Sequence, residues 1–235
     1  MKPAVEPAAA AQPGHLCWPE LALIAAAVLA TLSSALALST LHFIFKPLTM
    51  LIAIAWVTLR ATRDGPMRRF DALLIAALVA SLAGDVFLML PGGYFIPGLA
   101  SFLVAHLFYN ALFRQGVAWL PSRCALIGTL VVGGAMYAWV WAGLADPVFK
   151  VAVAAYVLVI ALMLAQAIGR AVLLRDAASI AVALGAGIFM LSDSLIAVNR
   201  FVQPLPLASL WVLSSYYLAQ ILMIHNAREP GRGNR

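Results

Sequence analysis

Charged residues are scarce in this chain. Of its 235 residues, 10% are Asp, Glu, Lys or Arg, whereas 64% are hydrophobic. A soluble domain of this length needs far more polar surface, so the composition excludes an ordinary water-soluble protein. Lipid offers no water to unpaired backbone groups, and only helices or a closed barrel can span it. The apolar runs are continuous over about 20 residues and do not alternate with period two, which favours helices.

Cysteine and histidine are also rare. The two cysteines, Cys17 and Cys124, stand alone without a CxxC pair, and both fall at predicted cytoplasmic helix ends, where thiols stay reduced. The four histidines form no ligand motif, and His15 and His225 lie toward the cytoplasmic side, which leaves only His42, His106 and two aspartates as possible ligands. We therefore predict no metal site and no other cofactor.

Basic residues exceed acidic ones, 15 against 9. They are scattered through short loops and form no stripe or aromatic platform, so we predict no nucleic-acid partner. Lys and Arg are retained in the cytoplasm. Twelve of the 15 fall on one side of the predicted membrane: Lys2, Arg60, Arg63, Arg68, Arg69, Arg114, Arg123, Arg170, Arg175, Arg228, Arg232 and Arg235. This predicts a multi-pass protein of the bacterial inner (plasma) membrane with both termini in the cytoplasm.

Turn residues such as Pro91-Gly92-Gly93 divide the apolar runs into eight segments. We predict an all-α, polytopic integral membrane protein. Its transmembrane domain spans residues 17–227, between a disordered cytoplasmic tail at 1–16 and a cytoplasmic tail at 228–235. Ala35-Leu36-Ala37 resembles a signal-peptide cleavage site, but the long apolar run favours a retained first helix. The predicted helices lie near residues 17–38, 41–60, 70–90, 94–114, 122–142, 148–169, 177–199 and 206–226.

A shift of 108 residues superposes two parts of the chain. Asp85 then falls on Asp193, and Leu99-Ala100-Ser101 falls on Leu207-Ala208-Ser209. The third and fourth predicted helices thus resemble the seventh and eighth, which predicts a parallel 4+4 internal repeat about an axis along the membrane normal. Such an axis brings Asp85 and Asp193 to one cavity.

Asp85 and Asp193 are the acidic residues that lie deep in predicted helices, whereas the other seven lie in tails, loops or first turns. Each sits about 15 residues along a helix that runs outward, so both fall at similar depth in the outer half of the membrane. An ionised carboxylate in hydrocarbon costs several kcal/mol, so each must be protonated, paired or exposed to a wet cavity. Both are candidate catalytic residues; the alternative is a structural hydrogen bond or ion pair that fixes helix packing.

Other polar side chains lie at the same level. Lys46 precedes Pro47 and can bind a phosphate, pair with an aspartate or extend toward the outer surface. His106 lies midway along its helix and is either a ligand-facing group or a satisfied packing group. Some of the remaining donors will only join helices to each other. The full set of candidate substrate-binding residues is Lys46, His106, Tyr109, Ser192, Asn199, Arg200, Tyr217 and Gln220.

Five segments in order resemble the lysoplasmalogenase family, also known as the YhhN-like family. They are Lys46-Pro47-Leu48-Thr49-Met50, Gly84-Asp85-Val86-Phe87-Leu88, Gly98 through Ser101-Phe102 with His106 and Tyr109, Gly185-Ala186 with Ser192-Asp193-Ser194, and Tyr217-Leu218-Ala219-Gln220. The resemblance covers nearly the whole chain from the second helix onward. It implies an eight-helix membrane enzyme that hydrolyses the vinyl ether bond of a lysoplasmalogen, a lysophospholipid, to a fatty aldehyde and a glycerophospho-head group.

The resemblance also implies that Asp85 and Asp193 are an acid–base pair. Protonation of a vinyl ether gives an oxocarbenium ion that water attacks, so one acid and one base suffice. Two neighbouring carboxylates at low dielectric do not both ionise easily, and we expect one to stay protonated. The residues leave open which one. We expect Lys46 and Arg200 to hold the phosphate, and His106, Tyr109, Tyr217 and Gln220 to orient water and the ether oxygen.

Three other functions use similar residues. An intramembrane aspartyl protease needs Gly in its GxGD signature where this chain has Leu82, which disfavours it. A proton-coupled transporter or lipid flippase also uses paired acids and a repeat, and remains the main alternative. A non-enzymatic scaffold would tolerate Asp85→Asn.

Overall fold

The structure is a computed structural model that describes residues 18–63 and 66–227. The predicted tails at 1–16 and 228–235 and Cys17 lie outside the described residues. Within them the chain forms helices and no strand, which confirms the all-α prediction. The elements are α1 (Trp18–Ala35), α2 (Ser39–Arg63), α3 (Arg69–Met89), α4 (Phe95–Phe113), α5 (Arg123–Val140), η1 (Trp141–Gly143), α6 (Pro147–Leu174), α7 (Ala177–Phe201) and α8 (Ala208–Asn226).

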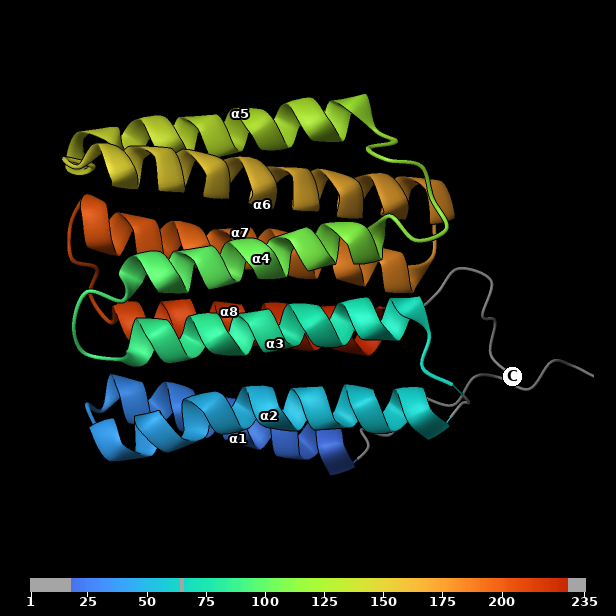
Figure 1. The fold of residues 1–235 in the computed structure, drawn as a ribbon, viewed down its shortest axis with the longest axis horizontal. Coiled ribbons are helices and arrows are strands. Elements are labelled where there is room, and N and C mark those ends of the chain that lie inside the picture. Colours follow the sequence, from blue (N-terminus) through green and yellow to red (C-terminus); the bar gives the residue numbers. More distant parts are fainter. Residues whose placement is uncertain (1–17, 64–65, 228–235) are drawn as a thin grey trace, which may run out of the picture.

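Seven of these helices, α1 to α7, are long and apolar enough to cross a membrane. α8 has 19 residues but also carries polar side chains along its length, among them Ser214, Ser215 and Gln220. It nevertheless packs against α7 and α1 and runs alongside them (Figure 1). Its most polar long side chain, Gln220, is buried within the bundle.

The helices form two layers. α2, α3 and α4 neighbour one another in that order in one layer, and α1, α8 and α7 do so in the other. α6 packs against both α4 and α7 and so closes one side of the two layers, while α5 packs outside on α6 (Figure 1). The hairpins α3–α4 and α7–α8 lie in different layers and run in the same direction, as the predicted repeat requires. The repeat itself remains a prediction.

Most of the basic residues lie at one end of the bundle. The connections α2–α3, α4–α5 and α6–α7 lie at the end of the bundle where α8 ends, and the other connections lie at the opposite end (Figure 1). Arg60 and Arg170, near the ends of α2 and α6, are at this basic end and contribute to packing. Arg60 Nη1 donates to Ile224 O at 3.2 Å, and Arg170 Nη1 donates to Gln115 O at 2.7 Å.

Helix ends differ from the predicted positions by up to five residues. The largest difference is at α6, which continues to Leu174 and not to residue 169, so Arg170 is helical and not in a loop. The extension is stable because Arg170 and Gln166 are buried and bind backbone groups of the α4–α5 connection. Gln166 Oε1 accepts from Leu120 N at 2.6 Å.

Gly143 illustrates how tightly the opposite end is packed. A Cβ atom on Gly143 would overlap the carbonyl oxygen of Phe201, at the end of α7. Backbone cannot move aside as a flexible side chain can, so the η1 turn tolerates only glycine at this point. This contact fixes η1 against the helix that carries Asp193.

We expect Gly143→Ala to destabilise the protein by about 1–3 kcal/mol, because the new methyl group must displace backbone. Thermal unfolding in detergent, followed by loss of the monodisperse elution peak, measures the change. Gly134→Ala on α5 is the matched control, since nothing lies within 4 Å of a Cβ atom there. Equal melting temperatures for the two variants would contradict this account.

Candidate active site

Asp85 and Asp193 occupy equivalent places in α3 and α7. Each lies 16 residues after the first residue of its helix, and both helices start at the basic end of the bundle. At 1.5 Å per residue, each carboxylate lies about 24 Å along its helix, well toward the opposite end. Asp85 is 3% exposed, and the side chain of Asp193 is 11% exposed.

Asp85 is held by two donors from different helices. Lys46 Nζ of α2 lies 3.3 Å from Asp85 Oδ1, and Tyr216 Oη of α8 donates to Asp85 Oδ2 at 2.7 Å. Lys46 is itself only 7% exposed. The lysine therefore forms a buried ion pair, one of the roles that the sequence left open, and is not extended to the surface.

A line of hydrogen bonds continues from Asp85 into the bundle. Gln220 Nε2 donates to Tyr216 Oη at 3.4 Å, and Tyr109 Oη donates to Gln220 Oε1 at 2.5 Å. These side chains come from α4 and α8. These hydrogen bonds give each of the four buried polar side chains a partner, and they connect the two layers of helices.

Asp193 has different partners. Tyr156 Oη of α6 donates to Asp193 Oδ2 at 2.6 Å, and His106 Nε2 of α4 lies 3.7 Å from the same oxygen. His106 is fully buried, and neither of its ring nitrogens has a hydrogen-bond partner among the described residues. The rings of Tyr156 and Phe189 flank it, with centroids 5.2 and 4.9 Å from its own.

Three aromatic rings lie between the two groups. Phe102, Phe189 and Tyr216 make edge-to-face contacts with one another, with centroids 5.5–6.3 Å apart. Tyr216 belongs to the Asp85 group, and Phe189 packs on His106 of the Asp193 group. The two carboxylates thus occupy adjacent but separate polar clusters and make no hydrogen bond to each other.

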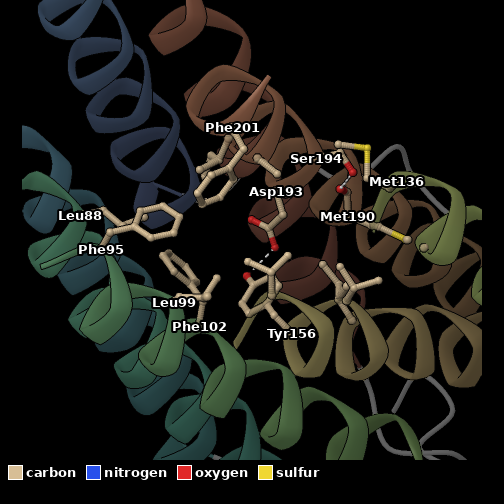
Figure 2. A pocket seen from close by; sticks show the side chains of 16 residues that line it. Leu88, Phe95, Leu99, Phe102, Met136, Tyr156, Met190, Asp193, Ser194 and Phe201 are labelled. Carbon is tan, nitrogen blue, oxygen red and sulfur yellow. Dashed lines mark hydrogen bonds between the residues drawn. The ribbon is translucent and has the colours of Figure 1, made fainter. Parts of the chain in front are cut away.

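An apolar pocket opens beside Asp193 (Figure 2). Its walls come from α3 to α7 and include Phe95, Leu99, Phe102 and Tyr156. Its cavity volume is about 60 Å³. The Asp193 carboxylate points into the space between Tyr156 and the phenylalanine rings (Figure 2). Asp85 is not among its lining residues.

The other predicted site residues take varied positions. Ser192 Oγ donates to Val212 O at 2.9 Å, and Asn199 Oδ1 accepts from Leu205 N at 2.8 Å, so both join α7 to the chain that follows it. Tyr217 Oη is buried without a hydrogen-bond partner among the described residues. Arg200 is exposed, with Cζ 4.2 Å from the ring centroid of Phe95 at the pocket wall.

The candidate residues named from the sequence include neither Tyr156 nor Tyr216. The structure makes Tyr216 a direct partner of Asp85. Tyr156 lies well inside α6, away from the membrane surfaces where tyrosine is usually enriched. A tyrosine at that depth needs a partner for its hydroxyl, and this was the available signal. No three His, Cys, Asp or Glu side chains gather in a metal-binding group within residues 18–63 and 66–227.

Fold and site define a class: a multi-pass helical membrane protein with buried carboxylates, one of them on the wall of an apolar pocket. The model of the YhhN family matches residues 41–227, that is α2 to α8, and the chain belongs to this family.

Its relatives include bacterial and animal proteins. Lysoplasmalogenase TMEM86B of Homo sapiens is 32% identical over 185 residues, which cover 78% of this chain and 74% of that protein. Lysoplasmalogenase TMEM86A of Homo sapiens is 35% identical over 67% of each chain. The lysoplasmalogenase of Mycobacterium tuberculosis (strain CDC 1551 / Oshkosh) is 31% identical over 67% of this chain and 61% of that protein. No solved structure is similar enough to match.

The Lys46–Asp85 pair makes a prediction for stability. We expect Lys46→Met to lower the free energy of unfolding by about 3 kcal/mol, because it leaves a buried carboxylate without its counter-charge. The double variant Lys46→Met/Asp85→Asn should recover most of the loss, since it removes both charges and keeps an acceptor for Tyr216. Thermal unfolding in detergent tests this, with Arg69→Met at an exposed position as control. Additive losses in the double variant would show that the pair is not coupled.

Proposed function

We propose that the protein is a lysoplasmalogenase that hydrolyses the vinyl ether bond of lysoplasmenyl-ethanolamine or -choline. The observation that carries the proposal is the Asp193 carboxyl on the wall of an apolar pocket, held by Tyr156 and next to His106. Membership of the YhhN family and relatives named lysoplasmalogenase support it. The products are a fatty aldehyde and a glycerophospho-head group.

The chemistry requires little beyond what the site offers. A carboxylic acid protonates the β-carbon of the vinyl ether and generates an oxocarbenium ion. Water adds to the α-carbon and loses a proton to a base, and the hemiacetal then collapses to aldehyde and alcohol. We propose Asp85 and Asp193 as the two carboxyl groups on which this chemistry depends. His106 is fully buried, its ring nitrogens have no hydrogen-bond partner among the described residues, and its Nε2 lies 3.7 Å from Asp193 Oδ2, so it is suited to orient the Asp193 carboxyl group.

The alkenyl chain and the phosphate of the substrate suit different places, the apolar pocket and the exposed Arg200 beside it. The alkenyl chain fits the apolar walls formed by side chains such as Leu99 and Met136. The phosphate fits Arg200, whose guanidinium stacks on Phe95 and leaves its N–H edge available for an anion. Lys46 is less suited to this role than the sequence implied, because it is already paired with Asp85. If the basic end of the bundle lies on the cytoplasmic side of a bacterial inner membrane, this phosphate site lies on the outer side.

We expect purified protein in detergent to release aldehyde from a lysoplasmalogen. Asp193→Asn should lower kcat by about 10²–10⁴-fold, the usual range for loss of an acid–base group, and Asp85→Asn should also lower kcat strongly. Asp146→Asn is the matched control: it changes an exposed carboxylate that caps α6, and Asn caps as well as Asp. If the wild type releases no aldehyde but moves a solute or lipid across the membrane of liposomes, the protein is a transporter or flippase and not a lysoplasmalogenase.

We also expect Arg200→Met to raise KM about tenfold for lysoplasmenyl-ethanolamine, because a charge-assisted contact to the phosphate is lost. The same variant should behave as wild type on an alkenylglycerol, which has no phosphate. Steady-state kinetics on the two substrates separate the effects. A similar KM change on both would show that Arg200 acts on the fold and not on the phosphate.

A further inference from the structure

We infer that the two aspartates do different work: Asp193 alone exchanges protons with substrate and water, and Asp85 is a positioning residue that stays ionised in its pair with Lys46. The inference rests on the proposed function and assigns the roles that the sequence left open. Three sets of contacts carry it.

The first set surrounds Asp85. Lys46 Nζ contacts Oδ1 at 3.3 Å and Tyr216 Oη donates to Oδ2 at 2.7 Å, so each oxygen faces a donor. An ionised carboxylate accepts hydrogen bonds at both oxygens and needs such donors. A buried ammonium in turn requires a negative partner, and Asp85 is the carboxylate in contact with Lys46. Asp85 is therefore the wrong group to carry a transferable proton.

The second set surrounds Asp193. Both of its contacts, Tyr156 Oη at 2.6 Å and His106 Nε2 at 3.7 Å, are to the same oxygen, Oδ2. Neither partner carries a permanent charge, and no lysine or arginine forms an ion pair with Asp193 within the described chain. A neutral carboxylic acid suits these surroundings: Oδ2 accepts from Tyr156, and Oδ1 carries the proton on the side of the pocket.

The third set separates Asp85 from the pocket. A reacting carbon must approach the acid to about 3–3.5 Å. Asp193 lines the pocket and meets this condition, whereas Asp85 does not line it and is 3% exposed. Phe102 and Phe189 pack edge-to-face on Tyr216, which is bound to Asp85. Asp85 thus acts through Tyr216, by holding the ring against which Phe189, and with it His106, is packed.

The proton balance needs one carboxyl group. Asp193 Oδ1–H protonates the β-carbon: the C=C π electrons form the new C–H bond, and the O–H electrons remain on the carboxylate. Water adds to the α-carbon of the oxocarbenium ion and returns a proton to Asp193. Asp193 then gives its proton to the glycerol oxygen, which keeps the electrons of the breaking C–O bond, while the hemiacetal O–H electrons form the C=O bond and Asp193 takes up the hydroxyl proton. One water is consumed, and Asp193 ends protonated as it began.

Infrared spectroscopy of the purified protein tests the protonation states without any substrate. We expect the C=O stretching band of a protonated carboxylic acid in the wild type, its loss in Asp193→Asn, and its retention in Asp85→Asn and in Lys46→Met/Asp85→Asn. Tyr156→Phe should shift the band, because it removes the hydrogen bond to Oδ2. No band in the wild type, or a band that survives in Asp193→Asn, overturns the inference.

Activity gives a second test. If Asp85 acts only by position and charge, Lys46→Met/Asp85→Asn should be at least tenfold more active than Asp85→Asn, because it removes the unpaired lysine and keeps an acceptor for Tyr216. Asp193→Asn should stay inactive in every background. A folded double variant as inactive as Asp85→Asn overturns the positioning role. A wild type without activity refutes the proposed function instead, and the infrared result then still decides the protonation states.

Discussion

Every polar group inside this bundle must find its partner within the protein, because the surrounding lipid supplies none. This constraint explains the arrangement of Asp85, Lys46, Tyr216, Gln220 and Tyr109 as one connected line across four helices. It also explains why α8, which is not among the helices apolar enough to cross a membrane by composition, turns Gln220 inward. The few side chains that stay unpartnered, above all His106, then become the natural places for a ligand or a water molecule.

The two acid clusters divide the interior into a part that holds the helices together and a part that lines the apolar pocket. The Asp85 cluster joins both layers and reaches the pocket wall through the edge-to-face contact of Tyr216 with Phe102. The Asp193 cluster is closed by α6, which lies beside both layers. Equivalent positions in a predicted repeat thus carry different environments.

Much of the fold was accessible from the sequence, because hydrophobic length and turn residues dictate membrane helices almost directly. Eight helices and the depth of Asp85 and Asp193 followed from such patterns. The partners of the aspartates did not, since they depend on which helices are neighbours. Tyr156 lies 37 positions from Asp193 and Lys46 lies 39 from Asp85, and no spacing rule connects them. Arg170 was assigned to a loop because a basic residue at a helix end normally meets water, whereas here it binds loop carbonyls.

α6 contributes to two features at once. It forms one wall of the apolar pocket, through Val153 and Ile160, and it carries the Tyr156 hydroxyl that holds Asp193. An outward swing of this helix to admit a long chain would withdraw that hydroxyl in the same movement. Asp193 would regain its hydrogen bond only after the helix returns and encloses the bound chain. One helix would thus make the reaction follow the entry of the substrate.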